Sequence, residues 1–311
     1  MSTATTTIKA KQRPGDRVFS GSAVFAGSMI LVTLAAVAIF LIVQSLPALV
    51  ATNAEASILE TNFWAYVGPL VFGTVWAAAL ALLMAVPVSI GIALFISHYA
   101  PRRLAQGLGY LVDLLAAIPS VVFGLWGLSF LMPLVGPMFQ WLSDNMGWFA
   151  PFSGYIGPAK NITTASLVLA AMILPIITAT IREVFLQTPR LHEEASLALG
   201  ATRWEMIRQA VLPFGRSGII SAAMLGMGRA LGETMAVLMV LSPGFAINLS
   251  ILQPGQHQSI AANIANQFPE ASGLGADVLI ATGLFLFLLT FVVNLVARWV
   301  INRRAEFSGA N

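Results

Sequence analysis

The sequence contains no cysteine and very little charge. Charged residues make up 9% of its 311 residues, whereas they make up about a quarter of an ordinary soluble domain. Without cysteine, the chain has no disulfide, no thiolate metal site and no cysteine nucleophile. With so little charge and 58% hydrophobic residues, the chain is built to lie in lipid.

Two signatures of enzymes are also missing. No Gly-x4-Gly-Lys-Ser/Thr sequence occurs, so the chain cannot hold ATP phosphates in the P-loop manner. His98, His192 and His257 are far apart in the sequence and show no metal-binding spacing. We therefore expect no catalytic residue, no metal ligand and no cofactor in this chain, which argues against an intramembrane enzyme.

Apolar runs long enough to cross a bilayer recur along the whole chain. They predict an all-α integral membrane protein with six transmembrane helices, at about residues 22–45, 66–97, 107–134, 162–185, 217–241 and 277–301. Residues 22–301 then form one six-span domain between an N-terminal segment, 1–21, and a tail, 302–311. The first run could also be a signal peptide, but its length and the lack of a convincing cleavage site favour an uncleaved span.

The basic residues predict the orientation of these spans. Of the 16 Lys and Arg residues, all except Lys160 and Arg229 lie in or beside the segments on the side of the termini. Because positive residues are retained on the cytoplasmic side of short loops, both termini are expected in the cytoplasm of a cell inner-membrane protein. The basic residues form no single patch, so we expect membrane lipid and no nucleic acid as a partner.

The loop at about residues 187–216 has the pattern of two short helices joined by a sharp turn. Thr188 is a candidate cap for the first helix, and Gly200 can take the left-handed conformation that ends it. Thr202 and Glu205 have the spacing of a capping box, which starts the second helix at once. From this pattern alone, an ordinary amphipathic loop on the membrane surface remains an equal alternative.

The spacing of Glu194-Ala195, Gly200 and Leu212-Pro213 resembles the Glu-Ala-Ala-x3-Gly-x9-Ile-x-Leu-Pro loop of permeases from binding-protein-dependent ABC importers. In that family the loop is a coupling helix that sits in a groove of the ATPase subunit. Ser196 and Ala210 depart from the pattern, but both are small. The resemblance implies a type I ABC importer permease fold with ATP and Mg²⁺ bound by a partner. A secondary transporter would have no use for such a loop.

Ionisable side chains inside the predicted spans are candidates for a substrate pathway, because burying charge in lipid costs several kcal/mol. Arg229 and Glu233 are four residues apart, so a continuous helix would present both on one face, where they could bond one another. Gly228 and Gly232 beside them would let another helix approach. Arginine suits a tetrahedral oxyanion, although a purely structural ion pair is the alternative. Asp113 is a possible auxiliary residue.

The segment Gly226-Met-Gly-Arg-Ala-Leu-Gly-Glu-Thr-Met-Ala-Val237 resembles the fifth span of phosphate-specific ABC permeases, closer to the C-type of the two paired permeases. Residues 14–20 and 114–128, the latter containing Ser120, resemble the same family. The resemblance implies a phosphate permease that works by alternating access. Its partners would be a paralogous permease, two copies of an ATPase subunit and an extracytoplasmic phosphate-binding protein. Sulfate or molybdate is the alternative substrate, because permeases for those anions share the coupling loop.

The predicted topology can be tested by cysteine labelling, since the chain has no cysteine of its own. Single cysteines replacing Ser57, Ser153 or Ser259 are expected to react with an impermeant thiol reagent added outside intact cells. A cysteine replacing Ser196 is expected to react only after the membrane is opened. External labelling at position 196 would contradict the six-span arrangement.

Overall fold

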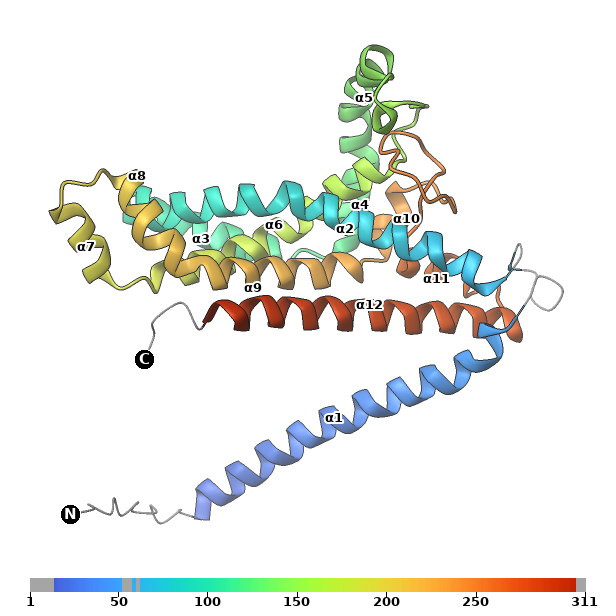
Figure 1. Cartoon of the computed structure of the whole chain (residues 1–311), viewed down its shortest axis with the longest axis horizontal. Coiled ribbons are helices and arrows are strands. Elements are labelled where there is room, and N and C mark those ends of the chain that lie inside the picture. Colours follow the sequence, from blue (N-terminus) through green and yellow to red (C-terminus); the bar gives the residue numbers. More distant parts are fainter. Residues whose placement is uncertain (1–13, 52–57, 60–61, 306–311) are drawn as a thin grey trace.

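The computed structural model describes residues 14–51, 58–59 and 62–305, and their ordered elements are helical (Figure 1). The helices are α1 (Pro14–Leu49), α2 (Phe63–Leu94), α3 (Arg102–Ala116), α4 (Ser120–Trp126), α5 (Met132–Met146), α6 (Ile162–Leu186), α7 (Arg190–Ala198), α8 (Arg203–Met206), α9 (Leu212–Leu231), α10 (Met235–Val240), α11 (Ile260–Gln267) and α12 (Leu274–Ala305). Short π-helical turns at Phe95–Tyr99, Gly127–Leu131 and Ile207–Val211 continue α2, join α4 to α5 and join α8 to α9.

Six helical stretches are long and apolar enough to cross a membrane, as the sequence predicts. They are Gly15–Leu49, Phe63–Tyr99, Ser120–Met146, Ile162–Leu186, Arg203–Leu231 and Leu274–Trp299. The number of spans is therefore confirmed among the described residues. The third and fifth spans differ from the predicted ranges, and both differences come from breaks in the helices.

Within the predicted range 107–134, the long continuous helical stretch begins at Ser120. Residues 102–116 form the separate helix α3, and the chain turns at Ala117–Pro119 before α4 begins. Pro119 has no backbone N–H and disfavours helical geometry in the residue before it, which explains the break. Apolar residues continue through the turn, so the hydrophobic pattern alone does not reveal it.

The fifth span ends at Leu231, and the predicted range 217–241 is interrupted. Gly232 terminates α9, and a new short helix, α10, starts after Thr234. Glycine has low helix propensity, and the Glu233 carboxylate accepts a hydrogen bond from the backbone N–H of Ala236 at 3.1 Å. A new helix start is thus stabilised where the first helix stops.

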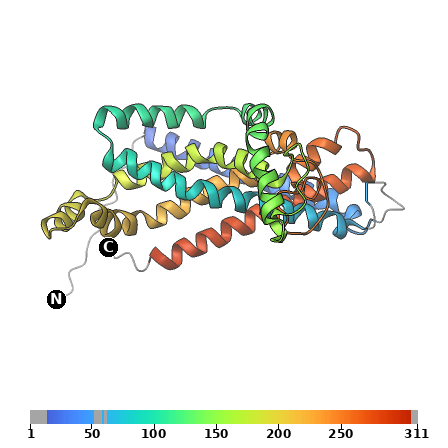
Figure 2. The same cartoon turned by 90° about the horizontal axis from the view of Figure 1, so that it is seen from above.

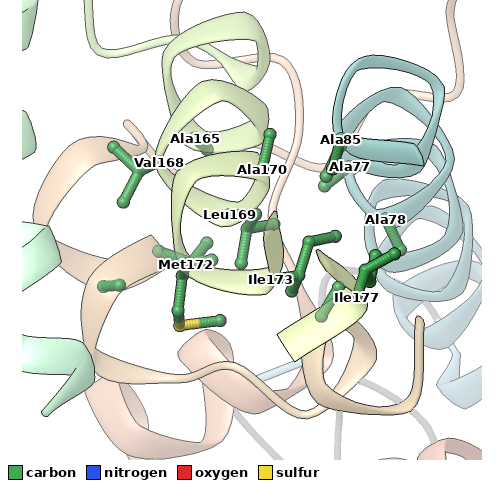
Figure 3. Close-up of a cluster of buried hydrophobic side chains, with 14 of the residues drawn as sticks. Ala77, Ala78, Ala85, Ala165, Val168, Leu169, Ala170, Met172, Ile173 and Ile177 are labelled. Carbon is green, nitrogen blue, oxygen red and sulfur yellow. The ribbon is translucent and has the colours of Figure 1, made fainter. Parts of the chain in front are cut away.

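The core is the contact between α2 and α6, which lie side by side in Figures 1 and 2. Small residues of α2, among them Ala77, Ala78 and Ala85, face larger side chains of α6 such as Ile173 and Ile177 (Figure 3). These side chains are all nearly inaccessible to solvent. Small residues on one helix let the two backbones approach closely, which is how helices associate in lipid, where no hydrophobic effect drives them together.

The start of α1 and the end of α12 lie at the same end of the molecule as α7 and α8 (Figures 1 and 2). An even number of spans requires this arrangement. The side chains of α1 are exposed along residues 15–37, and its later turns pack against α12.

The structure also refines the labelling test proposed above. Ser259 is only 4% exposed, because its side chain caps α11 by accepting from the Ala262 N–H. A cysteine there is therefore a poor reporter, and its expected external accessibility is wrong. Ser153 is partly exposed and stays suitable, whereas Ser57 lies outside the described residues.

Glycine is required at position 73 by a close backbone approach. A Cβ at Gly73 would lie 2.3 Å from the carbonyl oxygen of Gln258, whereas a Cβ at Gly91 of the same helix would meet nothing within 4 Å. Gly73→Ala is therefore expected to destabilise the protein by about 1–3 kcal/mol. Thermal unfolding of the detergent-solubilised chain measures this, with Gly91→Ala as the matched control. Equal stability of the two variants would show that the segment at Gln258 moves freely.

Candidate functional site

Two of the short helices created by the breaks run side by side. A Cβ at Gly124 of α4 would lie 3.0 Å from the Cα of Ala236 in α10, and one at Gly127 would lie 3.0 Å from Cγ1 of Val240. The residues that touch follow one another in the same chain order in both helices, so the two helices are parallel. Such parallel packing places the start of α4 beside the start of α10.

Ser120 is the first residue of α4, and Glu233 lies just before α10, so the structure brings these two predicted site residues to neighbouring helix starts. Ser120 is partly buried. The first turns of helices have backbone N–H groups without intrahelical partners. In transporters with broken helices, such starts face the anionic groups of the substrate.

Arg229 lies in the last turn of α9, directly before the break, and is partly buried. A positive charge is favourable there, because the carbonyl groups at the end of a helix carry partial negative charge. Within the part of the chain that the structure describes, no carboxylate lies within 4.0 Å of the guanidinium. The guanidinium can therefore donate two parallel N–H hydrogen bonds to one oxyanion.

The predicted bond between Arg229 and Glu233 is wrong. The prediction assumed one continuous helix, in which residues four apart share a face, but α9 ends at Leu231. Glu233 is only 8% exposed and uses its carboxylate on the first turn of α10. The two charges thus have separate roles in this structure.

Gly228 and Gly232 do not mediate a close contact between helices of this chain. A Cβ at Gly228 would meet nothing within 4 Å, and one at Gly232 would meet only the carbonyl oxygen of Gly228, at 3.8 Å. The face of α9 beside Arg229 is therefore open among the described residues.

Asp113 does not belong to this group. It lies on α3, outside the six candidate spans, and its side chain is 54% exposed. Its Oδ2 is 3.8 Å from Arg182, which also bonds Glu183 at 2.8 Å. The turn at Ala117–Pro119 separates α3 from α4, and α3 packs against α6, so the place of Asp113 inside the membrane stays a prediction.

The loop at 187–216 has the predicted helix, turn and helix. Gly200 adopts φ +85°, which is the left-handed conformation expected at the end of α7. Thr202 and Glu205 form both bonds of the capping box. Thr188 is not the cap of α7, because Pro189 occupies that position and no side-chain bond is made there.

Helix α7 exposes both charge and apolar surface. Glu194 and Ala195 are exposed, and the side chains of Leu191 and Leu199 are 75% and 90% exposed. Leu212 and Pro213 form the start of α9, and a cavity of about 410 Å³ separates α7 from this start.

Sequence reasoning missed a contact that holds this loop. His98, in the π-helical turn after α2, lies with its Nε2 atom 3.5 Å from the Glu193 carboxylate of α7. The two residues are far apart in the sequence, so no local pattern could reveal it. Among the described residues, no group of three His, Asp or Glu side chains could hold a metal ion.

Residues 85–306 match the protein family described as "Binding-protein-dependent transport system inner membrane component". "Phosphate transport system permease protein PstC 2" from Mycobacterium tuberculosis is 45% identical over 298 residues, which cover 92% of this chain and 91% of that protein. "Phosphate transport system permease protein PstC" from Mesorhizobium japonicum is 39% identical over 312 residues, covering 95% and 92%.

Solved structures of ABC transporters share the fold. An inward-facing structure of the MetNI methionine ABC transporter matches with a TM-score of 0.54 and 15% identity, over 77% of this chain and 96% of that one. A bacterial ABC transporter that imports the polysaccharide alginate matches with a TM-score of 0.54 and 19% identity, over 77% and 79%. The fold is therefore the all-α fold of type I ABC importer permeases.

Proposed function

The chain belongs to the family of binding-protein-dependent transport system inner membrane components, and we propose that it is the permease subunit of an ATP-driven importer of inorganic phosphate. The relatives named as phosphate transport permeases cover more than nine-tenths of its length. One structural observation supports an anion as the substrate. Arg229, without a carboxylate partner among the described residues, lies at a helix break inside the membrane domain.

The chemistry of this break suits a tetrahedral oxyanion. Arg229 supplies charge and two parallel N–H donors, and Ser120 supplies a hydroxyl at the start of α4. Glu233 fixes the start of α10 through its bond to Ala236, so it positions the site. Phosphate would pass from one side of the break to the other by alternating access, while the surrounding helices move.

The partners follow from the same proposal. The chain has no P-loop, so a separate subunit, in two copies, would bind ATP and Mg²⁺ and hydrolyse ATP. The exposed leucines of α7 and the rigid turn at Gly200 would form the coupling surface for that subunit. The open face of α9 at Gly228 fits a paralogous permease. An extracytoplasmic phosphate-binding protein would deliver the anion.

The orientation of the chain is part of the proposal. The end that carries α7 and α8 would be cytoplasmic, together with both termini, because the basic residues concentrate there. The segment between α5 and α6 and the segment between α10 and α12 would then face outside.

Uptake measured in proteoliposomes that contain all four components tests the substrate. Labelled phosphate is expected to accumulate with ATP inside, and excess unlabelled phosphate is expected to compete far better than sulfate or molybdate. Preferential uptake of sulfate or molybdate would replace phosphate with that anion and leave the importer proposal standing.

The role of Arg229 is tested by Arg229→Gln, which keeps a polar side chain and removes the charge and the planar fork. Losing charge-assisted hydrogen bonds of about 1.5–3 kcal/mol is expected to lower phosphate uptake roughly 10- to 100-fold. Membrane level and co-purification with the other subunits should stay normal. Because Arg229 and Glu233 are not paired, adding Glu233→Gln should restore nothing. Recovery of uptake in the double variant would mean that the two residues form a structural pair.

The coupling role of Gly200 is tested by comparing Gly200→Val with Gly200→Asn. Valine is strained at φ +85° by roughly 1 kcal/mol or more, whereas asparagine tolerates this conformation. No neighbouring atom lies within 4 Å of a Cβ there, so the backbone alone decides the outcome. We expect Gly200→Val to insert normally but to bind or stimulate the ATPase subunit poorly, and Gly200→Asn to behave like the wild type. Full ATPase stimulation by Gly200→Val would exclude the turn as the coupling element.

A further inference from the structure

A second cavity lies at the far end of α10 from the break. Its volume is about 200 Å³, and Val237 and Leu238 of α10, with Leu241 just after that helix, form one wall. Four polar residues complete it: Lys160, Ser242, Gln258 and Asn266. Since α10 rises about 1.5 Å per residue, the cavity is roughly 10 Å from the break that carries Arg229. In Figure 1, α10 and α11 lie away from the end that holds α7 and α8.

The charge of this cavity is unusual for its surroundings. Lys160 is the only basic residue in segments 46–65, 135–161 and 242–276. It is partly buried, and no carboxylate among the described residues lies within 4.0 Å of its amino group. None of the residues that line the cavity is acidic. A cleft lined by charge of one sign attracts ions of the opposite sign, so this cavity favours an anion.

Two further features favour an anion there. Lys160 directly precedes Asn161, the N-cap of the 25-residue helix α6, so the partial positive charge of that helix start adds to the charge of the lysine. Gln258 is 3% exposed, and its Oε1 atom makes no hydrogen bond within the described chain. A buried amide oxygen without a donor is unfavourable, and the O–H group of a protonated phosphate can donate a hydrogen bond to it.

The cavity walls are held rigidly. The backbone N–H of Ser242 donates to the carbonyl of Lys160 at 3.1 Å, and Asn161 donates to the carbonyl of Leu252 at 2.9 Å. The backbone of Gln258 lies so close to Gly73 that no Cβ would fit between them. The backbone of the cavity walls is therefore fixed before a ligand arrives, which reduces the entropy lost on binding.

We propose that Lys160, Ser242 and Gln258 form a second oxyanion subsite, which holds phosphate before it reaches Arg229. The identity of the anion rests on the proposed function, whereas the site itself rests on the cavity and its charge. The subsite would receive phosphate from the extracytoplasmic side and keep it next to α10 until the break becomes accessible.

Chemical modification of lysine tests this without measuring transport. The chain has only two other lysines, Lys9 and Lys11, which serve as internal references. The complete transporter in lipid nanodiscs is treated with an amine-reactive reagent, and modification at each lysine is followed by mass spectrometry. Inorganic phosphate is expected to slow modification of Lys160 several-fold and to leave Lys9 and Lys11 unchanged. Chloride at equal ionic strength is expected to have no such effect.

Protection by chloride as strong as that by phosphate, or no protection by phosphate, would overturn the subsite. The subsite would also be overturned if phosphate alone gave no protection but the binding protein protected Lys160 both with and without phosphate. Lys160 would then be a contact for docking of that protein. Should Lys160 stay unprotected while the wild type still takes up phosphate, only the subsite fails. Absence of phosphate uptake by the wild type would instead refute the proposed function.

A pair of variants supplies an independent measurement. Lys160→Gln is expected to lower phosphate uptake several-fold, and Lys160→Arg is expected to retain most of it because the positive charge remains. Both variants should bind the phosphate-loaded binding protein as the wild type does. Wild-type uptake by Lys160→Gln, or weaker binding of that protein, would contradict the subsite.

Discussion

Inside a bilayer every backbone N–H and C=O group needs a partner from the protein, and this constraint governs the whole structure. Continuous helices satisfy it, and most of the described chain consists of them. The helical structure is interrupted at Ala117–Pro119 and at Gly232–Thr234, where one helix ends and another begins. Such breaks are tolerated only where other groups of the protein, or a polar pathway, satisfy the freed backbone. Arg229, Ser120 and Glu233 are gathered at these two places.

Close packing keeps the breaks in position. Gly124 and Gly127 allow α4 to touch α10, while the alanines of α2 allow α6 to approach across the core. The bond from Glu233 to Ala236 then fixes where α10 starts. A charged arginine thus lies directly before the start of α10, and the interactions that fix this start do not use its donors. Those donors remain available for an anion, and the open face of α9 remains available for a partner subunit.

Much of this could be predicted from the sequence. Apolar runs revealed six spans, because length and composition are sufficient signals in lipid. Gly200 and the Thr202–Glu205 capping box were predictable, since both depend on local chemistry. The two helix breaks could not be predicted, because apolar residues continue through them. The helical spacing of the sequence also continues past Gly232 without a visible interruption. The supposed Arg229–Glu233 bond and the assumption of one unbroken helix through Asp113 and Ser120 both followed from that. The contact of His98 with Glu193 and the cavity at Lys160 depend on tertiary structure alone.

The central claim is that a free arginine at a broken helix receives the transported anion. The most direct measurement is an electron cryomicroscopy structure of the assembled transporter, trapped with a vanadate-inhibited ATPase in the presence of phosphate. We expect phosphate within hydrogen-bonding distance of the Arg229 guanidinium, with the Ser120 hydroxyl next to it and Glu233 still bonded to the start of α10. Phosphate bound elsewhere in the pathway, with Arg229 paired to Glu233, would contradict it.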